Sequence, residues 1–282
     1  MKLPDGFRFS QGNLQDFVDC RRRFQLRYIL RQAWPAVDSE PFIENEHFRQ
    51  QGQQFHQLAQ GYFIGIPPEE LARMIQDPEL EVWWDNFIIY FSGLMSSDEW
   101  GELEIYPEVV LSTSVGGFNL VAKFDLILVH TDGAITIYDW KTSRARPDAK
   151  ILANKLQSQV YPYLLTQTGI SHSQNIDANP HLVKMIYWFA NFPDLPQVFE
   201  YSEARFHEDR GALTSLVALI SRLDENEFVL TPDEKKCRFC VYRSLCDRGT
   251  AAGILSDPDD INEFDPVDYI DIDFEQVDDI EF

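Results

Sequence analysis

Two carboxylates and one lysine lie close together on a predicted β-hairpin, and their types and spacing are suited to chemistry. Residues 120–141 form two runs rich in Val, Ile, Leu and Phe, joined by an Asp-Gly turn. Asp125 interrupts the first run, and Asp139 and Lys141 lie two residues apart on the second. Because side chains alternate along a strand, Asp139 and Lys141 share a face and Trp140 points to the other.

This arrangement predicts metal-assisted hydrolysis. Two acidic side chains can hold a Mg²⁺ or Mn²⁺ ion that keeps coordination positions open for water and a phosphate oxygen. A lysine beside the ion can orient the attacking water and offset negative charge in the transition state. The simpler alternative is an ion pair between Lys141 and one Asp, and a single D-x-K motif fits either interpretation.

One histidine could join the carboxylates. His56 lies in a stretch, residues 47–96, whose apolar periodicity predicts several helices. It is either a structural residue beside a packed face or a nitrogen ligand added to the Asp pair. A site of one His and two carboxylates would favour Mn²⁺ or Mg²⁺ over Ca²⁺.

Four cysteines form a second candidate site. Cys237, Cys240 and Cys246 have the spacing C-x2-C-x5-C, which in a cytosolic protein indicates a metal or redox site. Three thiolates need a fourth ligand to complete a zinc or iron–sulfur site. The remaining cysteine, Cys20, falls in a predicted N-terminal helix capped by Ser10, where by itself it is a small core residue. If Cys20 joins, the site closes a very long loop, and zinc and iron–sulfur both remain open.

The predicted elements combine into a mixed α/β layer arrangement rather than a regular βαβ repeat. Their order is helices, three strands, a helix, two strands and a helix. A helix from about Asp148 to Gln167 follows the hairpin, and in it Gln159 and Tyr163 lie four residues apart on one face. Gln157 and Tyr161 have the same spacing.

Composition narrows the class of protein. The 282 residues can bury a full core, and we find neither an apolar run that could span a membrane nor a signal peptide, so we expect a cytoplasmic protein with reduced thiols. Twelve acidic residues and no Lys or Arg lie in 256–282, so the net charge of −22 leaves only −10 for the rest of the chain. Basic residues cluster at 21–31 and 141–155, and a local groove can therefore be positive.

Taken together, the motifs resemble the PD-(D/E)xK nuclease superfamily, and within it the RecB-like branch with an iron–sulfur cluster, which includes AddB-type nuclease domains and CRISPR-associated adaptation exonucleases. The order and approximate spacing match over residues 8–249. The matching positions are Ser10, Leu14, Phe17 and Cys20 (S-x3-L-x2-F-x2-C), Gly52 and His56 (G-x3-H), Asp125, Asp139 and Lys141 (D-x-K), Gln159 and Tyr163 (Q-x3-Y), and Cys237, Cys240 and Cys246. Lys123, two residues before Asp125, departs from the pattern and could touch phosphate or perturb metal binding.

The resemblance implies a restriction-endonuclease-like mixed β-sheet core flanked by helices, with a helical insert at about 40–98 and a C-terminal cysteine-cluster segment. Residues 1–250 would form the nuclease domain and 251–282 a disordered acidic tail. By resemblance, the catalytic metal is held by His56, Asp125, Asp139 and the Trp140 carbonyl. Lys141 is the catalytic lysine, and the four cysteines hold a 4Fe–4S cluster. Gln159, Tyr163, Arg144 and Arg146 contact DNA.

The expected activity is a Mg²⁺- or Mn²⁺-dependent deoxyribonuclease, an exonuclease on single-stranded ends. It would act in DNA repair, recombination or CRISPR adaptation, with a helicase or adaptation partner and no membrane. The alternative is a non-catalytic DNA-binding or scaffolding module held together by a zinc or iron–sulfur site.

Overall fold

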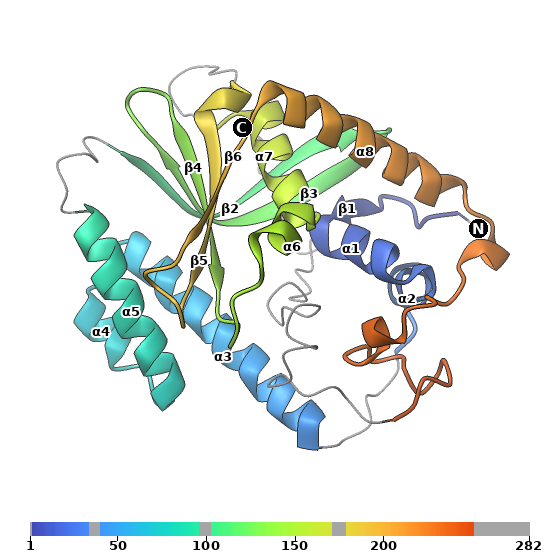
Figure 1. Cartoon of the computed structure of the whole chain (residues 1–282), viewed down its shortest axis with the longest axis horizontal. Coiled ribbons are helices and arrows are strands. Elements are labelled where there is room, and N and C mark those ends of the chain that lie inside the picture. The colour runs from blue at the N-terminus through green and yellow to red at the C-terminus, as the bar shows by residue number, and fades with distance from the viewer. Residues whose placement is uncertain (1, 34–39, 96–102, 171–178, 251–282) are drawn as a thin grey trace.

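The computed structural model describes residues 2–33, 40–95, 103–170 and 179–250, apart from the side chains of 40–45. The proposed acidic tail lies outside these residues. A mixed six-stranded sheet forms the centre, and helices cover both of its faces (Figure 1). The α/β class and the mixed sheet flanked by helices are therefore confirmed. The strands are β1 (Arg8–Ser10), β2 (Glu104–Val115), β3 (Phe118–Val129), β4 (Ile135–Lys141), β5 (Val183–Phe189) and β6 (Gln197–Glu200).

The sheet combines parallel and antiparallel pairs. Its order is β1-β3-β4-β5-β6, with β2 also paired to β3. Strand β3 is antiparallel to β2 and β4, β5 is antiparallel to β6, and the pairs β1–β3 and β4–β5 are parallel. The predicted turn between β3 and β4 is present, with Gly133 at φ +85° and the Asp132 side chain accepting a hydrogen bond from the Ala134 amide. Glycine adopts this left-handed conformation without steric cost.

Two hydrophobic cores cover the two faces of the sheet. Alternation along β3 and β4 sends Ile127 and Ile137 to the core under α7 (Gln157–Thr168) and α8 (Glu203–Arg222). It sends Leu128 and Trp140 to the other core. That core lies under the helical segment of α3 (Glu40–Phe63), α4 (Pro68–Ala72) and α5 (Pro78–Met95), as Figure 1 shows.

The predicted single N-terminal helix is wrong, because the chain breaks at Cys20. Ser10 caps α1 (Gln11–Asp19) as predicted, but Cys20 is extended at φ −159°. It is followed by α2 (Arg21–Phe24) and a π-helical turn, η1 (Gln25–Ile29). In a continuous helix Asp16 and Arg23 would lie about 10 Å apart along the axis. The break brings Arg23 Nε within 2.7 Å of the buried Asp16 carboxylate.

The helix predicted at 148–167 also divides. Asp148 caps α6 (Ala149–Asn154), the chain is extended at Lys155, and α7 begins at Gln157. This break fixes which face of α7 meets the sheet. The remaining short elements are 3₁₀ turns, namely η3 (Pro180–Leu182), η4 (Glu225–Glu227) and η5 (Glu234–Cys237). None of the helices in the described ranges has the length and apolarity needed to cross a membrane.

Candidate active site

The sheet opens beside Asp125. One edge of β3 pairs with β2, whereas the other pairs with β1 at Asn119–Val121 and with β4 only from Leu126 onward. Residues 122–125 thus have no strand partner on that edge among the described residues. The Trp140 amide instead donates a hydrogen bond to Asp125 Oδ2 at 2.8 Å. The carboxylate therefore stands at the point where β3 and β4 separate.

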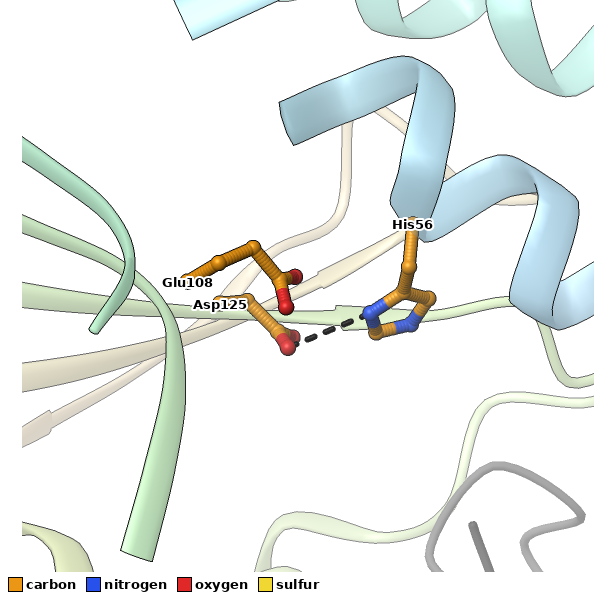
Figure 2. A group of neighbouring side chains, drawn as sticks. All are labelled: His56, Glu108 and Asp125. Atoms are coloured by element: carbon orange, nitrogen blue, oxygen red, sulfur yellow. Dashed lines mark ion pairs between the residues drawn. The ribbon is translucent and has the colours of Figure 1, made fainter. Parts of the chain in front are cut away.

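Three side chains from three elements converge there. Ligand atoms of His56 on α3, Glu108 on β2 and Asp125 on β3 all lie within 4.8 Å of one another. Figure 2 shows the two carboxylates directed toward the imidazole, whose Nδ1 is 3.1 Å from Asp125 Oδ1. In an octahedral Mg²⁺ site with bonds of about 2.1 Å, neighbouring ligand atoms are about 3 Å apart. The donor set and its spacing fit a divalent cation.

Glu108 was missed by the sequence analysis. Its neighbours Pro107 and Val109 pair with Leu126 and Phe124, so Glu108 lies opposite Asp125. Two acids facing each other across antiparallel strands repel, and this opposition was the available signal. Glu108 also adopts φ +53° within the strand, a conformation that costs about 1–3 kcal/mol and is characteristic of functional sites.

The charges at this point compensate one another. Burial by itself lowers the pKa of His56, but the Asp125 carboxylate, its hydrogen bond and the more distant acids outweigh burial and raise it. Burial and the Asp125 charge raise the pKa of Glu108, opposed by His56 and by the Lys123 ammonium, which pairs with Glu108. Lys123 thus supplies positive charge where two carboxylates crowd, and a bound cation would do the same.

Lys141 is held rigidly next to this group. Its Nζ lies 3.0 Å from Asp139 Oδ2 and 3.0 Å from Gln157 Oε1, and the Gln157 amide donates to Asp139 Oδ1. All three side chains are buried. As predicted, Trp140 points to the other face, where its indole stacks on Phe63. Only the Trp140 backbone therefore reaches the site.

A single cavity of about 420 Å³ joins the two groups. Its walls include His56, Glu108, Asp125, Asp139 and Lys141. The cavity wall also carries seven further polar side chains, which are five glutamines, one lysine and one tyrosine. They are Gln11, Gln53, Gln57, Gln60, Lys123, Gln157 and Tyr161. The cavity is therefore built to hydrogen-bond a polar ligand beside the carboxylates.

The pair Gln159 and Tyr163, which the resemblance places in contact with DNA, does not line this cavity. Tyr163 stacks on Phe206 of α8 with ring centroids 5.6 Å apart. Gln157 and Tyr161 occupy the cavity instead. A shift of two residues rotates a helix by about 200°, so the two pairs face opposite directions. Because α7 begins at Gln157, its cavity-facing side carries Gln157 and Tyr161.

The two predicted DNA-contacting arginines also lie outside the cavity wall. Arg144 pairs with Glu79 at 3.3 Å and lies 5.0 Å from the centre of the Phe48 ring. Arg146 donates to the Leu195 carbonyl at 3.3 Å and borders a separate cavity beside β6. The structure thus brings His56, Asp125, Asp139 and Lys141 together and places Arg144 and Arg146 elsewhere.

The four cysteines come together from both ends of the described chain. Burial raises the pKa of the Cys237, Cys240 and Cys246 thiols. The negative charge of Cys20 raises the pKa of all three further. The guanidinium groups of Arg22, Arg23 and Arg248 oppose this rise and would offset thiolate charge.

The spacing of the thiols bears on the metal. A tetrahedral zinc with bonds of about 2.3 Å holds its sulfurs about 3.8 Å apart. Within the described chain, no three thiols lie mutually within 4.8 Å. The described thiols are therefore not gathered into a tetrahedral zinc geometry.

Comparisons with known proteins place the chain in a family. A crystal structure designated SSO0001 is 16% identical with a TM-score of 0.42 and covers 86% of each chain. A structure from Eubacterium rectale, whose assignment as an exonuclease is provisional, is 14% identical with a TM-score of 0.43, covering 76% of this chain and 80% of its own. No curated protein matches. The family model of the PD-(D/E)XK nuclease superfamily matches residues 8–247, and the chain belongs to that superfamily.

Proposed function

We propose that this chain is a Mg²⁺- or Mn²⁺-dependent deoxyribonuclease that degrades single-stranded DNA from its ends. The observation that carries the proposal is the convergence, in one cavity, of His56, Glu108, Asp125, Asp139 and Lys141 from α3, β2, β3 and β4. Membership of the chain in a nuclease superfamily supports hydrolysis of a phosphodiester bond as the reaction. The DNA preference, the strand preference and the choice of metal are parts of the proposal.

The residues divide into two roles. His56, Glu108 and Asp125 would hold the metal, with Asp139 and the Trp140 carbonyl as the further ligands that the motif implies. When bound, the metal supplies Lewis-acid activation of water and of the phosphate. Asp139 and Gln157 fix the Lys141 ammonium, which orients the water and stabilises the charge that develops on the phosphate oxygens. Water attack forms the new P–O bond as the bond to the leaving sugar oxygen breaks.

The size and lining of the cavity support a single strand as substrate. Its volume of about 420 Å³ falls in the range of pockets for small ligands. A flexible single strand can bring one phosphate into such a cavity without first separating from a partner strand. The glutamines on its wall offer hydrogen bonds to phosphate and bases. We propose that a helicase or adaptation partner supplies the strand during repair, recombination or CRISPR adaptation in the cytoplasm.

We further propose that Cys20, Cys237, Cys240 and Cys246 hold a 4Fe–4S cluster with a structural role. The supporting observations are that the charge of Cys20 acts on the other three thiols and that neighbouring guanidinium groups would offset the negative charge of a cluster. The cluster would join the break after α1 to the C-terminal segment. Iron and zinc analysis of anaerobically purified protein tests it. Colourless protein with one zinc per chain would exclude the cluster and leave the nuclease proposal standing.

Cleavage of end-labelled DNA tests the activity. Single-stranded, double-stranded and RNA substrates are incubated with Mg²⁺ or Mn²⁺ and wild type, Lys141→Ala or the control Lys150→Ala. Lys150 is exposed on α6 and does not line the cavity. We expect wild type and the control to degrade single-stranded DNA and Lys141→Ala to lose activity on the order of 10²-fold or more. Cluster-loaded wild type that cuts none of the substrates would support the DNA-binding alternative.

A further inference from the structure

We propose that a second cavity, the basic pocket, binds a backbone phosphate of the same strand whose cleaved phosphate lies at the metal site. The basic pocket has a volume of about 160 Å³ and is lined by Arg23, Arg27, Arg49, Lys235, Lys236 and Phe239, among others. This inference rests on the proposed function, since it extends the substrate path of the nuclease. It assigns a role to residues that the metal site does not use.

Three distant segments build the basic pocket. Arg23 and Arg27 come from the N-terminal helices, Arg49 from α3, and the two lysines from the segment that carries the cysteines. Cys240 itself borders the pocket. The pocket therefore exists only where both ends of the domain meet, which gives the proposed cluster a function beyond stability. It would hold this binding site in shape.

Positive charge exceeds negative charge in the basic pocket. Arg23 pairs with Asp16 and Asp19, Arg27 also reaches Asp16, and Lys236 reaches Asp19 at 3.5 Å. Among the described residues, the pocket lining carries five cationic side chains and one carboxylate, that of Asp19. On a chain with net charge −22, a local surplus of this kind indicates a site for an anion.

Two further cations remain for a ligand. Arg49 has one ion pair, with Glu46 at 3.3 Å, and its buried Nε has no hydrogen-bond partner among the described residues. Lys235 is exposed and has no ion-pair partner within the described part of the chain. A phosphate group, with its several acceptor oxygens, matches such donors.

Helix α3 connects the basic pocket to the metal site. Arg49 and His56 are seven residues apart, so they lie on the same face of the helix and about 10 Å apart along its axis. Gln53 lies between them on that face and lines the catalytic cavity. One face of α3 therefore leads from the basic pocket directly to the metal ligands, as a strand bound at both would require.

A nucleic-acid strand fits this arrangement better than an acidic peptide. The partly exposed Phe239 ring on the wall can stack on a base, a contact common in proteins that bind single strands. The connection along α3 ends at a site built for phosphodiester chemistry. An acidic peptide could pair with the cations, but it has no phosphodiester to place at the metal site at the other end of α3.

Salt dependence of binding tests the inference in the full chain. The affinity for a labelled single-stranded oligonucleotide is measured by fluorescence anisotropy across a salt series without added divalent metal. Three double variants are compared with wild type. The first combines Arg49→Ala and Lys235→Ala, and the second preserves the charges with Arg49→Lys and Lys235→Arg. The third, a control, combines Arg73→Ala and Lys150→Ala. Arg73 and Lys150 are exposed and outside the basic pocket. Thermal unfolding of each variant confirms that it is folded.

Each phosphate contact to a single strand contributes about 0.7 to the slope of log K against log salt. Because the basic pocket binds one phosphate, we expect the double alanine variant to lose about 0.7 from that slope, and the charge-preserving and control variants to match wild type. An unchanged slope in the alanine variant overturns the inference, and so does an equal loss in the charge-preserving variant. Loss of poly(glutamate) binding without any change for DNA would also overturn it, in favour of an acidic peptide.

The proposed function fails in a different experiment. Hydrolysis of bis(p-nitrophenyl) phosphate by wild type with Mn²⁺ reports on the metal site alone, because this small diester has no second phosphate. Suppose that wild type binds the oligonucleotide with the expected salt slopes but does not hydrolyse the diester. This result would refute the proposed nuclease activity and leave the proposed phosphate binding in the basic pocket standing.

Discussion

Gln157 is the residue on which the geometry of Lys141 depends most directly. Its amide accepts from the Lys141 ammonium at 3.0 Å and donates to Asp139. Gln157→Leu retains the approximate volume and removes both hydrogen bonds. A hydrogen bond to a charged group contributes about 1.5–3 kcal/mol, but Lys141 and Asp139 keep each other as partners. We therefore expect a loss of unfolding free energy of only about 1–3 kcal/mol.

The effect on activity should be larger than the effect on folding. Removing a residue that orients a metal ligand typically costs 10- to 100-fold in activity, and we expect the turnover rate of Gln157→Leu on single-stranded DNA to fall by about that factor. Gln159→Leu is the matched control, since it makes the same substitution on the opposite face of α7. It should retain turnover close to that of wild type.

The comparison is made by measuring single-turnover rates and thermal unfolding for both variants. If Gln159→Leu lost as much activity as Gln157→Leu, the assignment of the cavity face would be wrong. If Gln157→Leu unfolded at the temperature of wild type and kept full activity, the positioning role would be refuted.

Three further predictions concern metal binding, pH and backbone strain. Glu108→Gln should weaken Mn²⁺ binding by roughly ten-fold or more in a calorimetric titration, and unchanged affinity would remove Glu108 from the site. Burial raises the pKa of Asp209 from 3.8 to about 6, so its contribution to stability is complete below pH 3.8 and is lost as pH rises through 6. Asp209→Asn should therefore gain up to about 3 kcal/mol relative to wild type between pH 4 and pH 7 in denaturant unfolding, and a constant difference would contradict this. Gly116→Ala should destabilise the fold by about 1–2 kcal/mol, because Gly116 has φ +60° and a Cβ there would lie 3.1 Å from Val217. In the control Gly93→Ala the new Cβ meets no atom within 4 Å, so this variant should be neutral or stabilising. Thermal unfolding of both variants measures the difference.

Much of the site was predictable because its signals are local. The turn at Asp132-Gly133 and the alternation of β4 follow from turn chemistry and the two-residue period of a strand. These rules alone put Asp139 and Lys141 on one face and Trp140 on the other. The structure confirms that arrangement, and it places Asp125 where β3 and β4 separate.

Other residues escaped prediction because their roles depend on neighbours far along the chain. Glu108 joins His56 and Asp125 only through the register of β2 on β3 and an unusual backbone angle. The break at Cys20 follows from buried ion pairs between α1 and α2 rather than from a Gly or Pro signal. No periodicity within one segment reports such contacts.

The sequence by itself determined the types of the chemical groups, their order and the face that each takes within its own strand, because periodicity is a property of one element. Only the tertiary structure decided which of two identical Q-x3-Y spacings meets Lys141, since the phase of α7 is set by the break at Lys155 and by packing against the sheet. Metal ligands must meet to within a few tenths of an ångström. Distances of that kind between β2, β3 and α3 are set by strand register and core packing, which bring together residues that are remote in the chain.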